Sequence, residues 1–250
     1  MSASPAEASH HLEHFAAFLE LLQKEGLTFT VIGGCAVEAY ARSIQENMST
    51  VDLDIMVDES TMRDVLRWAP TVDIRVVTRP QPRNVPVAFL DVDGKEVNVL
   101  TASHGLPEPS QLARLARIFT LRGFDGLEVP VADPYDLLAN KLAVKREKDL
   151  PHIGILKRFI ELEIVETFSS ETHARARLDP AKRYLDVLGL DELPEDLGEK
   201  LLKSAREGVD FRFLAGRLPI SLAEALLERI DTAQAQYRQV EAILESRRGV

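Results

Sequence analysis

The first half of the chain alternates between helical and strand-like spacing of its apolar residues. The stretch LEHFAAFLELLQKEG, residues 12–26, repeats apolar residues at helical spacing and stops at a glycine, which predicts a helix. Short runs rich in β-branched and aromatic residues predict strands. In chain order, the pattern predicts strands at 28–34, 51–57 and 72–77, and helices at 35–44 and at 60–69, the latter capped by Ser60.

Two further segments are predicted to form β-hairpins. In residues 86–101, Asp93 and Gly94 separate two alternating apolar runs, and this dipeptide is the strongest short signal for a hairpin turn. Residues 117–132 repeat the arrangement around a glycine-containing turn. The strands of these hairpins would extend the sheet that the first strands begin.

The spacing after the second hairpin is helical. Asp133 is a typical helix N-cap and is followed by a proline, which predicts a helix beginning there. From about residue 149 to the end we find no strand pattern. The sequence therefore predicts an α/β (α+β) fold, in which a head with a small mixed sheet over residues 1–132 precedes an all-helical part over residues 133–250.

Composition narrows the class of protein. With 250 residues and 45% apolar composition, the chain is long enough for one large domain or two modest ones. It has a single cysteine, Cys35, so no intrachain disulfide can form. The first residues lack a secretory pattern, and no apolar run approaches the roughly 20 residues needed to cross a bilayer. We expect a cytoplasmic protein without a membrane partner.

The charge pattern limits how nucleic acid could bind. A formal charge of −10 argues against a protein whose whole surface binds polyanions. Residues 139–158, however, form a local basic stretch. Within it, Lys141, Lys145 and Lys148 have the spacing of one stripe along a helix.

The strand predicted at 51–57 carries two carboxylates in an otherwise apolar run. Asp52 and Asp54 are two positions apart, so their side chains point to the same face of the strand. Two neighbouring carboxylates repel unless a cation, an ion pair or open solvent compensates them. A divalent metal does so, and Mg²⁺ typically takes one or two carboxylates, waters and nucleotide phosphate oxygens.

A glycine pair precedes this strand. Gly33 and Gly34 end one predicted strand and begin a helix, where free backbone N–H groups and the absence of side chains favour a phosphate. Such a pair is more often only a turn. Together with Asp52 and Asp54, it predicts a nucleotide-handling site.

This arrangement resembles the nucleotidyltransferase superfamily that includes DNA polymerase β and the aminoglycoside adenylyltransferases. The resemblance covers residues 29–100, and VIGGCAVEAY with STVDLDIMV is most similar to the bacterial AbiEii-type group of toxin–antitoxin pairs. It implies that Gly33 and Gly34 hold the triphosphate and that Lys141 reaches phosphate or substrate, with Lys148 and Asp149 closing the site. Further expected nucleotide contacts are Thr50, Lys145 and Arg146.

The resemblance also implies a third carboxylate on a neighbouring strand, where it can act as the base for the attacking hydroxyl. This sequence has Asn98 at the expected position. An amide can bind a metal through its oxygen but cannot accept a proton. Either Glu96, on the same strand face, substitutes as the base, or the reaction is slow or absent.

The sequence therefore predicts an enzyme that uses Mg²⁺ or Mn²⁺ to transfer NMP from an NTP to an acceptor hydroxyl. The expected acceptor is RNA, including tRNA, bound by the basic stretch and the helical part, and the resemblance suggests an antitoxin protein as a partner. Two alternatives stay open. One is an adenylyltransferase of the antibiotic-modifying type, and the other is a non-catalytic protein with the same fold that binds a partner.

Overall fold

The computed structural model describes residues 11–79, 86–121, 123–170, 174–194, 196–197 and the isolated positions 232, 235 and 239. The chain divides into two compact units, Met1–Phe159 and Ile160–Val250. The domain boundary predicted after residue 132 falls inside the first unit, because helix α5 (Pro134–Val144) packs against α2 (Gly33–Ser43). Whether the chain folds as two domains that meet at residue 132 stays a prediction.

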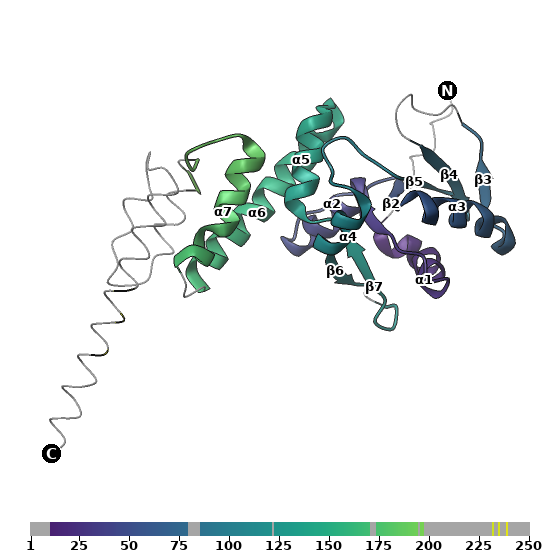
Figure 1. Cartoon of the computed structure of the whole chain (residues 1–250), viewed down its shortest axis with the longest axis horizontal. Coiled ribbons are helices and arrows are strands. Elements are labelled where there is room, and N and C mark those ends of the chain that lie inside the picture. The colour runs from purple at the N-terminus through teal and green to yellow at the C-terminus, as the bar shows by residue number, and fades with distance from the viewer. Residues whose placement is uncertain are drawn as a thin grey trace, which may run out of the picture. The chain divides into compact units, whose positions relative to one another are not determined.

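A seven-stranded mixed sheet forms the centre of the first unit (Figure 1), which confirms the predicted fold class. Its order is β3-β4-β5-β2-β1-β7-β6. Strand β2 is antiparallel to β1 but parallel to β5, and β1 is parallel to β7. The bounds are β1 (Thr30–Ile32), β2 (Asp52–Met56), β3 (Arg75–Val77), β4 (Val87–Val92), β5 (Lys95–Leu100), β6 (Arg117–Thr120) and β7 (Glu128–Val131).

Both predicted hairpins are present, namely β4 with β5 and β6 with β7. At the tip of the first, Asp93 and Gly94 both have positive φ angles, 53° and 78°. A two-residue turn with positive φ at both positions matches the twist of the flanking strands. The dipeptide therefore fixes which residues of β4 and β5 face each other.

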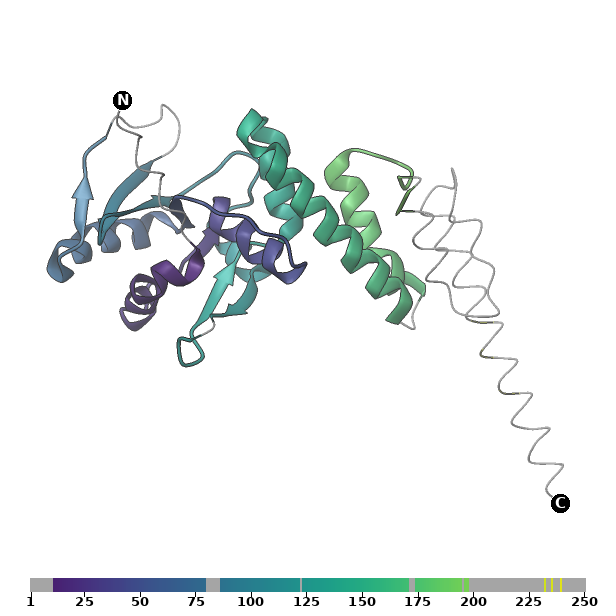
Figure 2. The same cartoon turned by 180° about the vertical axis from the view of Figure 1, so that it is seen from behind.

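The two faces of the sheet differ in polarity around β2 and β5. The alternate residues Leu53, Ile55, Val97 and Val99 are fully buried on one face. Each such side chain stabilises the fold by roughly 1.5–3 kcal/mol relative to an exposed one. Helices α1 (Ala16–Lys24) and α3 (Glu59–Trp68) lie together on one side of the sheet in Figures 1 and 2, and Phe18 and Trp68 join them with ring centroids 6.4 Å apart.

The opposite face of β2 and β5 carries polar residues in register. Asp52 pairs with Glu96, and Asp54 pairs with Asn98, across the two parallel strands. Because residues two apart on a strand share a face, all four side chains project from the same surface. We call this surface the polar face.

Three helical features differ from the sequence prediction. Helix α3 is capped by Asp58, whose carboxylate accepts a hydrogen bond of 2.7 Å from the Thr61 N–H, so Ser60 is not the cap. A short helix, α4 (Pro109–Leu115), was not predicted. The basic stripe is also interrupted, because α5 ends at Val144 and Lys145 adopts a left-handed conformation. A single-turn helix, η3 (Glu147–Asp149), follows it.

Beyond η3, the described residues form helices with a break at 189–194, and none of them forms a strand, as predicted. Helix α6 (Leu150–Ser170) begins in the first unit and ends in the second, which also contains α7 (Ala174–Leu188). Within the second unit, the Tyr184 hydroxyl donates a hydrogen bond of 3.1 Å to Glu161. In the described part of the chain, no helix has the length and apolar content needed to span a bilayer.

Candidate active site

The two aspartates of β2 are bridged by an amide. The Asn98 side-chain nitrogen donates hydrogen bonds of 3.2 Å to Asp52 and 2.9 Å to Asp54. The Thr50 hydroxyl, just before β2 begins, donates a hydrogen bond of 3.3 Å to an Asp52 carboxylate oxygen. Asn98 therefore lies at the carboxylates, where the sequence placed it, and its own carbonyl oxygen is buried without a partner among the described residues.

The carboxylate pair (Asp52 and Asp54) is electrostatically strained. Burial, followed by the nearby Asp52 charge, raises the pKa of Asp54 from 3.8 to about 6. The hydrogen bond from Asn98 and the positive charges of Lys141 and Arg146 lower this pKa, but they offset only part of the increase. A cation at the pair would offset the repulsion between the two carboxylates and favour the ionised form of Asp54.

The glycine pair brings the start of α2 directly against these side chains. Gly33 has a φ of +67°, and a Cβ placed there would lie 2.0 Å from an Asp54 carboxylate oxygen. A Cβ on Gly34 would lie 2.5 Å from the Thr50 hydroxyl. The glycines are therefore required by close packing against Asp54 and Thr50, and their predicted contact with phosphate would be additional to this role.

Cys35 follows the glycines and is buried. Its thiol donates to the Asp52 backbone carbonyl at 3.3 Å. Burial and then the negative charges of nearby carboxylates raise the pKa of this thiol well above its usual value. A thiol held in this form is a weak nucleophile, so Cys35 acts as a small packed residue beside the carboxylate pair.

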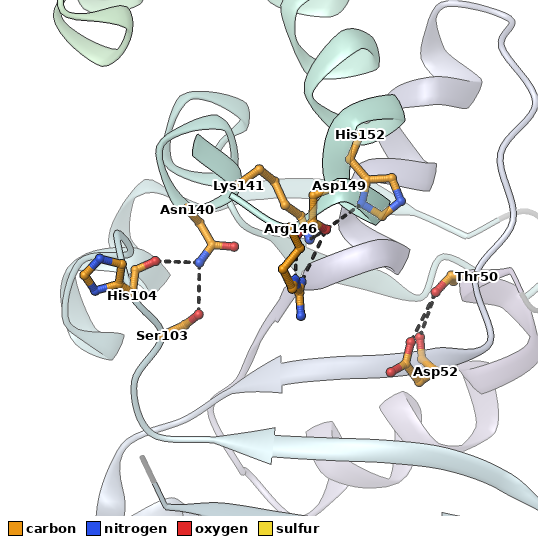
Figure 3. A network of polar contacts seen from close by, with 9 residues as sticks. All are labelled: Thr50, Asp52, Ser103, His104, Asn140, Lys141, Arg146, Asp149 and His152. Atoms are coloured by element: carbon orange, nitrogen blue, oxygen red, sulfur yellow. Dashed lines mark hydrogen bonds and ion pairs between the residues drawn. The ribbon is translucent and has the colours of Figure 1, made fainter. Parts of the chain in front are cut away.

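A second charged cluster lies where α5 meets α6. Figure 3 shows Lys141, Arg146 and His152 converging on Asp149. The Lys141 ammonium is 3.1 Å from Asp149, and both side chains are almost completely buried, at 3% and 0% exposure. Arg146 binds the same carboxylate through two nitrogens, at 2.7 and 3.3 Å, and the His152 Nδ1 lies 3.5 Å away. We call these four residues the Asp149 cluster.

The positive charges dominate the Asp149 cluster. Burial alone would raise the pKa of Asp149, but hydrogen bonds from Arg146 and Lys141 outweigh it and hold that pKa below its ordinary value. Burial and the neighbouring Lys141 charge lower the pKa of His152. Asp149 is therefore ionised and His152 neutral near pH 7.

Polar contacts hold α5 against the loop that follows β5. The buried Asn140 amide donates to the Ser103 hydroxyl at 3.0 Å and to the His104 carbonyl at 2.7 Å (Figure 3). Gly105 allows the loop to approach, because a Cβ there would lie 2.9 Å from the Ala143 Cβ. This packing places Lys141 close enough to influence the pKa of Asp54.

The remaining predicted site residues are exposed or already paired. Lys145 and Lys148 are exposed, and Arg146 is half exposed while bound to Asp149. Glu96 is 2.8 Å from Arg79, so its carboxylate is already paired in this structure. Asp149 and Arg79 affect the charge of the site through their ion pairs with Arg146 and Glu96, and sequence spacing alone does not specify these contacts.

The oxygen ligands at the carboxylate pair suit a metal ion that is bound partly by the protein and partly by a nucleotide, rather than one bound by protein side chains alone. No group of three or more His, Cys, Asp or Glu side chains suited to a metal occurs in the part of the chain that the structure describes. Two carboxylates and one amide oxygen do match Mg²⁺ that takes its remaining ligands from water and a nucleotide phosphate. If the Asn98 side-chain amide rotated by a half turn, its unpartnered oxygen would face the carboxylates and join this ligand set.

Comparison with known proteins gives only distant similarity. No family model and no curated protein matches the chain. Among solved structures, the lincosamide adenylyltransferase LnuA in complex with lincomycin is 14% identical, with a TM-score of 0.46 over 61% of this chain and 99% of its own. ANT(2″)-Ia in complex with adenylyl-2″-tobramycin is 12% identical, with a TM-score of 0.41 over 69% and 97%. At TM-scores below 0.5, the function must be inferred from the residues of this chain.

Proposed function

We propose that this protein is a metal-dependent nucleotidyltransferase that transfers NMP from an NTP to an acceptor hydroxyl and releases pyrophosphate. The observation that carries the proposal is the carboxylate pair on β2, which lies against the glycine start of α2 and has a raised Asp54 pKa. When bound, Mg²⁺ or Mn²⁺ would be held by Asp52 and Asp54 and would neutralise phosphate charge. RNA, including tRNA, is the proposed acceptor.

The residues of this chain would supply binding and orientation. Gly33 and Gly34 let the first turn of α2 approach Asp54 and Thr50 closely. We propose that the backbone N–H groups of this turn bind phosphate. Thr50 orients the Asp52 carboxylate by its hydrogen bond. Lys141 and Arg146 contribute positive charge near Asp54, and we propose that they attract the triphosphate.

Fewer basic residues in the stretch 139–158 are available to bind RNA than its composition indicated. Lys141 and Arg146 are paired with Asp149, and Arg158 is paired with Glu46. Lys145, Lys148 and Lys157 have no ion-pair partner among the described residues and are the cations of this stretch that we propose for RNA phosphates. The AbiEii-type assignment and an antitoxin partner rest on the sequence resemblance alone and stay predictions.

One observation favours a non-catalytic alternative. The Asn98 amide donates to both carboxylates and thereby occupies the position between them that a cation would take. If this arrangement persists with nucleotide present, the protein would bind a partner through a nucleotidyltransferase-like surface without catalysis. The antibiotic-modifying alternative requires an acceptor that carries positive charge and would be tested with the same assay.

The deciding experiment measures transfer of label. The protein is incubated with each labelled NTP, Mg²⁺ or Mn²⁺, and either total tRNA or an aminoglycoside, and each acceptor is scored for label. We expect label in RNA that is lost in Asp54→Ala. If the wild type lacks a base, Asn98→Asp should raise transfer, because general-base assistance is typically worth about 10²–10⁴-fold. If Glu96 already acts as the base, Asn98→Asp adds a like charge beside the carboxylate pair and should leave the rate unchanged or lower. Label in neither acceptor, with both the wild type and Asn98→Asp, would favour the non-catalytic alternative.

A further inference from the structure

Three residues beside the carboxylate pair, Arg79, Phe89 and Glu96, form a cluster, and of these only Glu96 has a candidate role, as the base. Arg79 follows β3, and its guanidinium carbon lies 5.2 Å from the centre of the Phe89 ring. The same guanidinium is 2.8 Å from Glu96. Phe89 pairs directly with Asn98 across β4 and β5, and Glu96 pairs with Asp52 across β5 and β2. The cluster therefore adjoins the carboxylate pair on the polar face.

Arg79 is held in place but remains accessible. Its side chain is 45% exposed, and the half-buried Phe89 ring supports one side of the guanidinium. Guanidinium groups bind phosphate oxygens through paired N–H donors and are often held ready by stacking on an aromatic ring. An exposed ion pair such as Arg79–Glu96 is weak, so a phosphate can displace the carboxylate at little cost.

Arg75, at the start of β3, provides a contrast to Arg79. Arg75 pairs with Asp91, but that carboxylate also accepts a hydrogen bond of 2.8 Å from the Gly94 N–H of the hairpin turn. Asp91 is thus part of the turn structure. Among the described residues, Glu96 has no hydrogen-bond or ion-pair partner other than Arg79, so it becomes free if Arg79 leaves.

We propose that Arg79 is a subsite for a phosphate of a single-stranded RNA acceptor, and that its binding releases Glu96 to act as the base that Asn98 cannot be. This inference rests on the proposed function. The acceptor oxygen bonds to the α-phosphorus, and the bond from that phosphorus to the pyrophosphate oxygen breaks. The hydroxyl proton passes to Glu96. Acceptor binding and base activation are thereby coupled, which suppresses reaction before RNA is bound.

The binding part is tested without metal or NTP. Anisotropy of a short, fluorescein-labelled single-stranded RNA is measured over a salt series with EDTA present. Arg79→Ala should weaken binding by about tenfold at low salt and reduce the salt slope by about 0.7, the value of one single-strand phosphate contact. Arg75→Ala is the matched control, because it also removes an ion-paired arginine, and it should change neither the RNA affinity nor the salt slope. Equal slopes for the wild type and Arg79→Ala, or no RNA binding by the wild type, would overturn the subsite.

The Glu96→Gln variant tests whether an RNA phosphate replaces Glu96 as the partner of Arg79, or whether the Arg79–Glu96 pair serves only to hold the fold. Because this variant removes the internal competitor for Arg79, it should bind RNA more tightly than the wild type while kcat for transfer falls by about 10²-fold. Arg79→Ala should raise the acceptor KM and leave kcat nearly unchanged. Weaker RNA binding by Glu96→Gln would overturn the proposal that phosphate replaces Glu96 at Arg79.

The two proposals can fail separately. If the salt slopes behave as expected but no NTP yields transfer, the RNA subsite stands, whereas the nucleotidyltransferase proposal and the role of Glu96 as a base fall. If RNA is labelled efficiently but Arg79→Ala binds and reacts as the wild type does, the proposed function stands and the subsite falls.

Discussion

The carboxylate pair and the Asp149 cluster both place ionised groups in partly or fully buried surroundings, and they differ in how the charge is compensated. At Asp149, one carboxylate receives a buried lysine, a two-nitrogen contact from arginine and a nearby histidine. At Asp52 and Asp54, two carboxylates share one neutral amide. The pKa of Asp149 is lowered, whereas that of Asp54 is raised to about 6.

This difference separates a structural role from a binding role. The charges of Lys141, Arg146 and Asp149 are paired with one another, so the Asp149 cluster holds α5 and α6 in place without any ligand. The carboxylate pair lacks positive charge in direct contact and would gain free energy from a cation. The two clusters are also linked, because the charges of Lys141 and Arg146 already act on Asp54.

The largest expected effect comes from removing the carboxylate of the satisfied cluster. Asp149→Ala leaves the buried Lys141 ammonium and Arg146 without their partner, and breaking a buried ion pair in this way typically costs about 3–5 kcal/mol. Urea denaturation would measure the loss in free energy of unfolding. Asp64→Ala removes the exposed partner of Arg67 and should change this free energy by less than about 0.5 kcal/mol. A similarly small change for Asp149→Ala would contradict the structural role.

The next effect concerns the close contact at the carboxylate pair. Gly33→Ala combines a left-handed backbone with a Cβ that would overlap Asp54, and we expect a loss of about 2–4 kcal/mol in free energy of unfolding. Gly123→Ala is the matched control, because its φ is also positive, at +82°, but nothing lies within 4 Å of the added Cβ. It should cost about 1–2 kcal/mol. Equal losses in thermal or urea unfolding would show that Gly33 is needed only for its backbone conformation.

The smallest effect is a pH dependence at Asp54. Because its pKa is higher in the folded state, the unfolded chain ionises first as pH rises, and the wild type loses stability between about pH 4 and pH 6. Without metal, Asp54→Asn should therefore stabilise the fold by about 1–3 kcal/mol at pH 8 and by almost nothing below pH 4. Urea denaturation across this pH range measures the difference. A gain that does not vary with pH would refute the raised pKa.

Much of the fold followed from local patterns. The alternation in β2 predicted that Asp52 and Asp54 share a face, and the Asp93-Gly94 turn predicted the pairing of β4 with β5. The position of Asn98 on a strand beside Asp52 and Asp54 was implied by the family resemblance rather than by a local pattern. Helix α4 has only seven residues, too few for a clear helical period. At α3, Asp58 and Ser60 are both good caps, and only the backbone path shows that Asp58 is used.

The electrostatic environment of the site depended on contacts that the sequence does not specify. Continuous helical spacing predicted Lys141, Lys145 and Lys148 on one stripe, but the helix ends at Val144, and the turn through Lys145 brings Arg146 and Lys141 to the same carboxylate. Likewise, Arg79 and Glu96 meet only because β3, β4 and β5 are adjacent in the sheet.

The central claim is that the carboxylate pair binds a divalent cation together with a nucleotide, and thermal unfolding tests it most directly. Melting is recorded for the wild type with Mg²⁺ or Mn²⁺ and each NTP at millimolar concentration. Ligand at about 100 times its Kd stabilises by about 2.7 kcal/mol, which corresponds to a rise in Tm of roughly 5–10 °C. Asp54→Ala should abolish the rise, whereas Asp91→Asn, a matched change on the same polar face, should retain it. No shift of the wild-type Tm with any metal and NTP would contradict the claim.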